Sequence, residues 1–133
     1  MPDYMYDHIH LYSPDPLKTA QFYEDMFNAE RVNARELPNG QVSVELSLSG
    51  SRILIMQQSA DAKPVSTARG AVSGLEHFGI RTDDIETAVT DLKAKGVEFR
   101  DDIWEIRPGI KISFLWAPED VLIELLEVKP RKE

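Results

Sequence analysis

The order of predicted elements repeats along this chain, and that repeat restricts the fold more than any other feature. Apolar periodicity and turn residues predict a strand, a helix and three strands, and then the same five elements again. In the first half, strands are predicted over residues 6–12, 30–38, 41–49 and 52–58, with a helix over 16–30. In the second half, strands are predicted over residues 75–82, 97–103, 110–117 and 121–128, with a helix over 83–96. A β-α-β-β-β unit that occurs twice predicts the α+β class, with modules over residues 5–58 and 75–128.

The two predicted helices carry clear local signals. Pro16 is tolerated in a first turn, and Asn28 suits a helix end because Asn adopts the left-handed conformation. In the second helix, acids occupy the first turn and Gly96 follows the last turn. Each helix has one apolar stripe, formed by Leu17, Ala20, Tyr23 and Phe27 in the first and by Ile85, Ala88, Val89 and Leu92 in the second.

Residues 59–74, "SADAKPVSTARGAVSG", separate the two halves. They are small, polar and rich in turn-forming residues, so we interpret them as a linker or a mobile loop. A length of 133 residues fits one domain, residues 1–133, that contains both modules.

Composition excludes several classes of function. The net charge is −8, which argues against nucleic acid as a partner, because binding it requires a basic patch. The chain has no cysteine, so thiolate metal sites and cysteine nucleophiles are excluded. No apolar run approaches the roughly 20 residues of a membrane span, and the start, "MPDYMYDH", lacks the features of a signal peptide. We therefore expect a cytoplasmic protein without a membrane partner.

The three histidines are distributed in step with the repeat. His8 precedes Leu54 by 46 residues, and His77 precedes Glu124 by 47 residues, so each half has a histidine at the same place in its first strand. His10 faces the same way as His8, about 7 Å further along the strand. We interpret His10 as a group that lines a pocket or touches substrate, or as a structural histidine, and not as a metal ligand.

Three stretches of the chain resemble the vicinal oxygen chelate superfamily. They are "HIHLYSPDPLKTAQFYEDMFNAE", "HFGIRTDDIETAVTDLKAKGVEF" and "APEDVLIELLE". The superfamily includes glyoxalase I, methylmalonyl-CoA epimerase, extradiol dioxygenases, and bleomycin- and fosfomycin-resistance proteins. The resemblance covers about residues 5–128. Phe27 and Asn28 stand where Leu-Gly is usual, and Ala117 and Asp120 depart from the family's Asp-Pro-x-Gly hairpin.

The resemblance implies two curled, mixed sheets around a cavity that holds one divalent metal ion. The matching ligand positions are His8, Leu54, His77 and Glu124, of which Leu54 cannot bind a metal. Two imidazoles and a carboxylate suit Zn, Ni, Co, Mn or Fe, and the sequence does not choose among these ions. Relatives commonly dimerise, and some build the cavity across two chains, so the resemblance also implies a homodimer.

Other side chains are candidates for chemistry around this site. A two-residue turn at Ser49-Gly50 pairs Glu45 with Leu54, and one at Gly50-Ser51 pairs Ser47 with Leu54. Either register places Glu45 on the face of Leu54, whereas a three-residue loop reverses this. We expect Glu45 to act as a base or a substitute ligand, with Glu124 as the second catalytic carboxylate. Arg107 is a candidate for binding a substrate anion, although surface solvation is the more common role of such an arginine.

Three kinds of function fit these features. The first is a metal-dependent lyase or isomerase of the glyoxalase I or methylmalonyl-CoA epimerase kind, acting on a small vicinal-oxygen substrate through a metal-stabilised enediolate. The second is an Fe(II) or Mn(II) extradiol-type dioxygenase with a two-His, one-Glu site. The third is a non-catalytic protein that binds a small molecule or an antibiotic.

Overall fold

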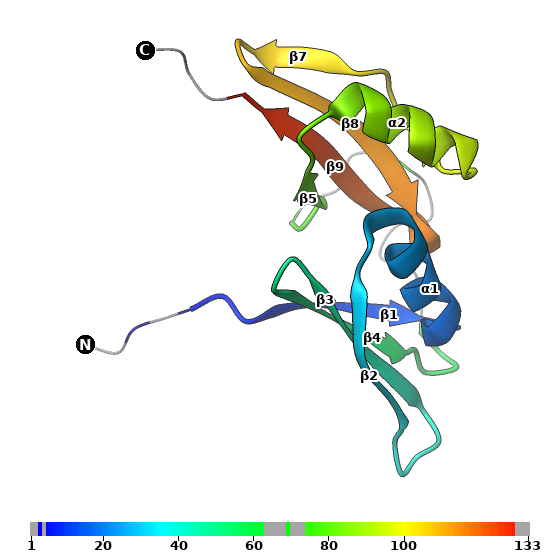
Figure 1. Cartoon of the computed structure of the whole chain (residues 1–133). Helices are drawn as coiled ribbons and strands as arrows, with labels where there is room; N and C mark the ends of the chain where they lie inside the picture. Colours follow the sequence, from blue (N-terminus) through cyan, green and yellow to red (C-terminus); the bar gives the residue numbers. More distant parts are fainter. Residues whose placement is uncertain (1–2, 4, 63–68, 70–73, 130–133) are drawn as a thin grey trace. The chain divides into compact units, whose positions relative to one another are not determined.

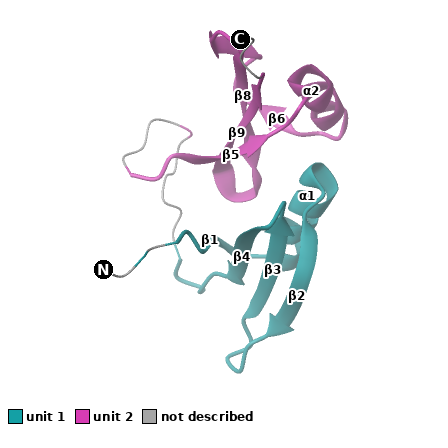
Figure 2. Ribbon diagram, turned by 60° about the vertical axis from the view of Figure 1, so that its left-hand side comes forward, with its two compact units in different colours: residues 1–63 teal, residues 64–133 magenta. Residues whose placement is uncertain are grey.

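The structure is a computed structural model of the chain (Figure 1), and it describes residues 3, 5–62, 69 and 74–129. The chain divides into two compact units, residues 1–63 and residues 64–133 (Figure 2). The predicted linker, residues 59–74, falls largely outside the described residues. Within the described parts of the chain, no helix has the length and apolar character needed to cross a membrane.

Unit 1 contains one helix and a four-stranded mixed sheet. Its elements are β1 (His8–Ser13), α1 (Pro16–Phe27), β2 (Glu30–Glu36), β3 (Val42–Leu48) and β4 (Ser51–Gln57). The strand order is β1-β4-β3-β2, in which β1 is parallel to β4 and the other neighbours are antiparallel. The first βαβββ module predicted from the sequence is therefore confirmed.

Helix α1 begins at Pro16, as predicted, but it ends at Phe27, before the predicted limit at residue 30. The Asp15 carboxylate accepts a hydrogen bond from the Lys18 amide, and Asn28 ends the helix in the left-handed conformation with a φ of 58°. The apolar stripe was predicted one residue out of place at its start. Pro16 is buried, whereas Leu17 is 44% exposed, because the buried face of this helix begins at its first residue.

Each sheet has two different faces, because successive side chains of a strand alternate. In unit 1, Val44, Leu46, Ile53 and Ile55 are buried on the face that α1 covers. We call the face turned away from the helix of the same unit the distal face. His8, His10 and Leu54 lie on the distal face of unit 1, since His10 is the ladder partner of Leu54.

The β3–β4 turn decides where Glu45 lies. Ser49 and Gly50 have φ values of 51° and 85°, as a two-residue type I′ hairpin requires. This turn pairs Glu45 with Leu54. The prediction that Glu45 shares the face of Leu54 is thus confirmed, in the first of its two possible registers.

Unit 2 repeats this architecture with one additional strand. Its elements are β5 (His77–Arg81), α2 (Ile85–Ala94), β6 (Glu98–Phe99), β7 (Trp104–Arg107), β8 (Ile110–Ala117), the 3-10 turn η1 (Pro118–Asp120) and β9 (Val121–Val128). The strand order is β5-β9-β8-β6, and β7 also pairs with β8. The parallel pair β5 and β9 corresponds to the pair β1 and β4. The α+β class with two mixed sheets is confirmed.

The predicted strand over residues 97–103 was wrong in its extent. Only Glu98–Phe99 is a strand there, because the chain bends at Asp101. The Asp101 carboxylate accepts from the Phe114 amide, and Ser113 Oγ donates to the Asp101 carbonyl. These bonds replace ladder contacts at the bend, and pairing with β8 resumes only at β7.

Both faces of the unit 2 sheet carry apolar side chains, but helix α2 covers only one of them. Ile85, Val89 and Leu92 of α2 are buried, as predicted, on the side of Leu115, Ile123 and Leu125. The distal face has its own apolar cluster of Ile112, Phe114 and Leu122, with the partly buried Ile110, Trp116 and Leu126 packed against it. The distal face of unit 2 is therefore largely apolar, and the guanidinium groups of Arg69 and Arg100 lie over the rings of Trp116 and Phe114 on it.

Candidate metal centre

Unit 2 brings two of the predicted ligands together. His77 on β5 and Glu124 on β9 project from the distal face, and His77 Nε2 lies 3.8 Å from Glu124 Oε2. Their side chains are 30% and 22% exposed, so both are partly withdrawn from water. Two donor atoms that bind one first-row cation at about 2.0–2.2 Å are at most about 4.4 Å apart. The spacing of this pair is thus compatible with one shared cation.

A glycine leaves room for the Glu124 carboxylate. Gly79 is the ladder partner of Glu124, and a Cβ at this position would lie 3.4 Å from Leu126 Cδ2 and 3.8 Å from Glu124 Oε1. The His77 ring packs edge-on against Phe114, with ring centres 5.0 Å apart. The Phe114 ring thus positions His77, and the space beside Gly79, which has no side chain, accommodates the Glu124 carboxylate.

A second carboxylate orients the His77 ring. Glu76 Oε1 lies 3.0 Å from Nδ1 of His77. An ionised carboxylate can only accept a hydrogen bond, so Nδ1–H of His77 donates to Glu76, and Nε2 is the ring nitrogen that lies near Glu124. Carboxylate–histidine pairs of this kind fix the ligating nitrogen in many metal sites.

Unit 1 repeats this arrangement at His8. Asp7 Oδ2 lies 2.7 Å from His8 Nδ1 and accepts from Arg52 Nη1 at 2.8 Å. The hydrogen bond with His8, followed by the charge of Arg52, lowers the pKa of the Asp7 carboxyl below its ordinary value. Asp7 therefore remains an acceptor at neutral pH, and His8 Nε2 is left available in the same way as His77 Nε2.

The strand registers show which positions of the two units correspond. On β1 and β4, His8 pairs with Arg52 and His10 pairs with Leu54. On β5 and β9, His77 pairs with Leu122 and Gly79 pairs with Glu124. His8 thus corresponds to His77, and Leu54 to Glu124, while His10 corresponds to Gly79. That His8, His77 and Glu124 bind one metal ion stays a prediction.

Glu45 lies on the distal face of unit 1 in an ion pair. Its carboxylate accepts from Arg52 Nη2 at 3.2 Å and from Arg52 Nε at 3.4 Å, and the side chain is 25% exposed. Arg52 therefore bridges Glu45 and Asp7. The sequence analysis did not single out Arg52, because only the three-dimensional pairing brings it to Asp7 and Glu45. It also did not single out the two carboxylates that precede the histidines. An acid directly before each strand histidine was the available signal.

The two predicted substrate-binding residues are exposed. The His10 ring lies between His8 and Tyr12, with ring centres 6.3 Å and 4.9 Å away. Arg107 is the ladder partner of Ile110, because a bulge in β7 shifts the register between Glu105 and Arg107. The bulge turns Arg107 to the distal face of unit 2, where it has no ion pair among the described residues. Both roles stay predictions.

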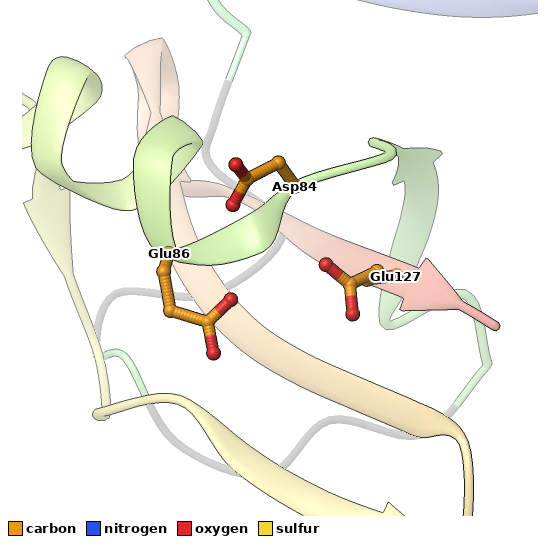
Figure 3. Close-up of side chains that lie close together, drawn as sticks. All are labelled: Asp84, Glu86 and Glu127. Atoms are coloured by element: carbon orange, nitrogen blue, oxygen red, sulfur yellow. The ribbon is translucent and has the colours of Figure 1, made fainter.

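An acidic cluster that the sequence analysis did not identify lies at the start of α2. Asp84, Glu86 and Glu127 each place a carboxylate oxygen within 4.8 Å of the other two (Figure 3). Asp84 caps α2, and Glu127 Oε1 accepts from the Ile85 amide at 3.1 Å. Glu86 pairs with Lys111 at 2.8 Å. These contacts explain the cluster as the cap of α2 and its attachment to the sheet.

The fold and the site define a class before any comparison is made. Two βαβββ units, each with a histidine on its first strand, make this chain an α+β protein built from a repeated module. The profile of the Glyoxalase/Bleomycin resistance protein/Dioxygenase superfamily matches residues 6–125. The chain belongs to this superfamily, as the sequence resemblance predicted.

Individual relatives are distant. The mouse and human mitochondrial methylmalonyl-CoA epimerases are each 28% identical over 125 residues, covering 90% of this chain and 70% and 71% of theirs. The uncharacterized protein YwkD of Bacillus subtilis is 27% identical over 122 residues and is covered to 94% of its length. These similarities extend over both modules.

Solved structures share the fold. A glyoxalase family protein from Enterococcus faecalis superposes with a TM-score of 0.76 at 21% identity, covering 92% of this chain and 97% of that one. The fosfomycin resistance protein FosX of Listeria monocytogenes, complexed with Mn(II) and a sulfate ion, gives a TM-score of 0.67 at 20% identity, with 94% and 93% covered. The fold is therefore one that holds a divalent metal ion in at least one other protein.

Proposed function

We propose that this chain is a metal-dependent isomerase or lyase that removes a proton from a carbon next to a carbonyl group. The observation that carries the proposal is the 3.8 Å approach of His77 Nε2 to Glu124 Oε2 on the distal face of unit 2. His8 has the corresponding position in unit 1. We propose that His8, His77 and Glu124 hold the metal ion.

The donor set fits a divalent cation chemically. Both histidines have Nδ1 held by a carboxylate, at 2.7 Å and 3.0 Å, so each has Nε2 free for a metal. Glu124 is a half-buried carboxylate on an apolar sheet face, and a cation compensates the desolvation of such a charge. Imidazole nitrogens with one carboxylate suit Zn, Co, Ni and Fe, and Mn is also held by such sets.

The side chains around the site divide the chemistry among them. A bound divalent cation supplies positive charge that stabilises the anion of a substrate with two neighbouring oxygens. Glu45 and Glu124 are the carboxylates that take the proton from the substrate carbon and return it. Arg107 offers a guanidinium for an anionic group of the substrate.

The relatives favour an acyl-CoA thioester as the substrate class. Two of them are methylmalonyl-CoA epimerases, and they match over 90% of this chain. In such a substrate, the carbon between two carbonyl groups has an acidic proton. An epimerase removes that proton from one side and restores it on the other, so carboxylates on both sides of the carbon would complete the reaction.

Solvent deuterium exchange tests this proposal directly. The purified protein is reconstituted with Zn, Co, Ni, Mn or Fe(II) and incubated in D2O with acyl-CoAs and hemithioacetals, and the loss of the substrate proton is followed by NMR. We expect metal-dependent exchange that Glu45→Gln slows by about 100-fold or more. Glu119→Gln, on the exposed 3-10 turn, is the matched control and should exchange at the wild-type rate. No exchange with any metal across this panel would contradict the proposal.

A second candidate function rests on Leu54, which cannot bind a metal ion. The family-like ligand set has only three members here, and two histidines with one carboxylate leave open positions of the kind that Fe(II) oxygenases use. Oxygen uptake with catechols by the Fe(II) or Mn(II) protein, without deuterium exchange, would favour an extradiol-type dioxygenase. A protein that retains no metal after dialysis against these ions would indicate a non-catalytic binding protein.

We also propose that the chain forms a homodimer. The support is the resemblance to a superfamily in which dimers are common. Light scattering of the purified protein should give twice the monomer mass of 15.1 kDa. A monomer mass would refute this part of the proposal.

A further inference from the structure

The two units differ at one pair of corresponding positions. In unit 2 the pair is a glycine on the first strand and a ligand on the last strand, Gly79 and Glu124. In unit 1 it is a ligand-type side chain on the first strand and an inert one on the last strand, His10 and Leu54. At this ladder pair, the residue able to bind a metal lies on the first strand in unit 1 and on the last strand in unit 2.

The His10 side chain is placed to serve this purpose. It shares the distal face with His8, and the ring centres of the two histidines are 6.3 Å apart. Within the described residues, neither nitrogen of the His10 ring has a hydrogen-bond partner. A change of side-chain rotamer brings two imidazoles at alternate positions of one strand to a common cation, because both project from the same face.

Other side chains near Leu54 are buried on the opposite face or already have a hydrogen-bond partner. Ile55 is fully buried on the opposite face, under α1. Gln57 accepts from the Val42 amide at 3.1 Å and pairs in the ladder with the buried Ser13. Glu45 is held by Arg52. Among the described residues on the distal face next to Leu54, His10 is the donor without a partner.

In place of the pocket-lining or structural role predicted from the sequence, we propose that His10 is the fourth metal ligand and takes the place that Leu54 cannot fill. This inference rests on the proposed metal site and completes it as His8, His10, His77 and Glu124. Three neutral imidazoles and one carboxylate give a nitrogen-rich site with few charges. Such a site favours Zn, Co and Ni over Mn and Mg, which prefer oxygen ligands. It also leaves the Glu45 carboxylate free of the metal.

An exchange of residues between the units tests the proposal. The binding of Co²⁺ and Zn²⁺ is measured by calorimetry, and the visible absorption of the Co²⁺ protein reports its coordination. We expect His10→Gly to weaken binding by about 100-fold or more and to change the Co²⁺ spectrum. The double variant His10→Gly/Leu54→Glu reproduces the Gly79–Glu124 pair in unit 1, and we expect it to recover most of the lost affinity.

Two controls separate ligation from folding. His10→Gly/Met56→Glu places the carboxylate two ladder pairs away from position 54 on the same face, since Met56 pairs with Tyr12, and it should not recover affinity. Thermal unfolding in EDTA shows whether each variant is folded without metal. If folded His10→Gly binds both ions as the wild type does, the role of His10 is overturned while the three-ligand site stands. If the wild type binds neither ion, the whole metal proposal is overturned.

Discussion

Glu76 and His77 are neighbours in sequence, and Oε1 of the first lies 3.0 Å from Nδ1 of the second. Asp7 and His8 repeat this relationship at 2.7 Å in the other unit. Neighbouring residues of a strand normally point to opposite faces, so this contact arises because both acids precede the first strand residue. The same tautomer is therefore favoured at both histidines.

This contact predicts that Glu76 tunes metal affinity without touching the metal. We expect Glu76→Ala to weaken Zn²⁺ binding by about 10- to 100-fold, because His77 loses the partner that holds its tautomer and orientation. Glu76→Gln retains an acceptor oxygen, so its Zn²⁺ affinity should lie between those of Glu76→Ala and the wild type. Calorimetry measures the affinities, and long-range ¹H–¹⁵N NMR spectra report the tautomer. Unchanged affinity and unchanged tautomer in Glu76→Ala would contradict the prediction.

Gly79 should tolerate a methyl group but not a larger side chain. The added Cβ of Gly79→Ala meets its neighbours at 3.4 Å and 3.8 Å, which are ordinary contacts. Its stability and metal affinity should therefore remain close to those of the wild type. The side chain of Gly79→Leu would take the space of the Glu124 carboxylate, so we expect at least about tenfold weaker metal binding. Chemical unfolding and calorimetry distinguish the two effects, and equal affinities for both variants would refute the argument.

Glu127 is expected to matter for stability and not for catalysis. Its side chain is 4% exposed, and Oε1 accepts from the Ile85 amide at the start of α2. Glu127→Ala leaves that amide buried and unsatisfied and opens a cavity, so it should lower the free energy of unfolding by about 2–3 kcal/mol. Glu127→Gln keeps an acceptor and should lose less. Urea unfolding measures both values, and an alanine variant as stable as the wild type would contradict this role.

Asp84 predicts part of the pH dependence of stability. Hydrogen bonds from the Thr87 hydroxyl and amide lower its pKa below the ordinary value of 3.8. Because the pKa is lower in the folded state, the cap stabilises the fold fully above pH 3.8 and loses this effect as the pH falls through the folded-state pKa. Asp84→Asn caps the helix without titrating. The free energy of unfolding, measured with urea at about pH 7 and about pH 3, should fall less between these pH values in Asp84→Asn than in the wild type. An equal fall in both proteins would contradict the prediction.

Much of the fold follows from local patterns. Helices α1 and α2 begin after Asp15 and Asp84 and end at Asn28 and before Gly96, since capping needs only a few neighbouring residues. The stripe of Ile85, Val89 and Leu92 identifies the buried face of α2 by its spacing alone. Alternation in β3, together with the Ser49-Gly50 turn, placed Glu45 on the face of Leu54.

Other features required the strands to be paired in space. The bend at Asp101, which divides a predicted strand, depends on hydrogen bonds to Ser113 and Phe114, twelve and thirteen residues away. Arg52 meets Asp7 from 45 residues away and forms ion pairs with both Asp7 and Glu45. No periodicity within a short window reveals such partners, because they belong to different strands.

The repeat of elements, the helix ends and the faces of the strands were legible in the chain because each depends on residues a few positions apart. Only the folded sheets show that the residue able to bind a metal lies on the first strand in the pair His10–Leu54 and on the last strand in the pair Gly79–Glu124. Hydrogen-bonded register between β1 and β4, and between β5 and β9, decides which distant residues stand opposite one another.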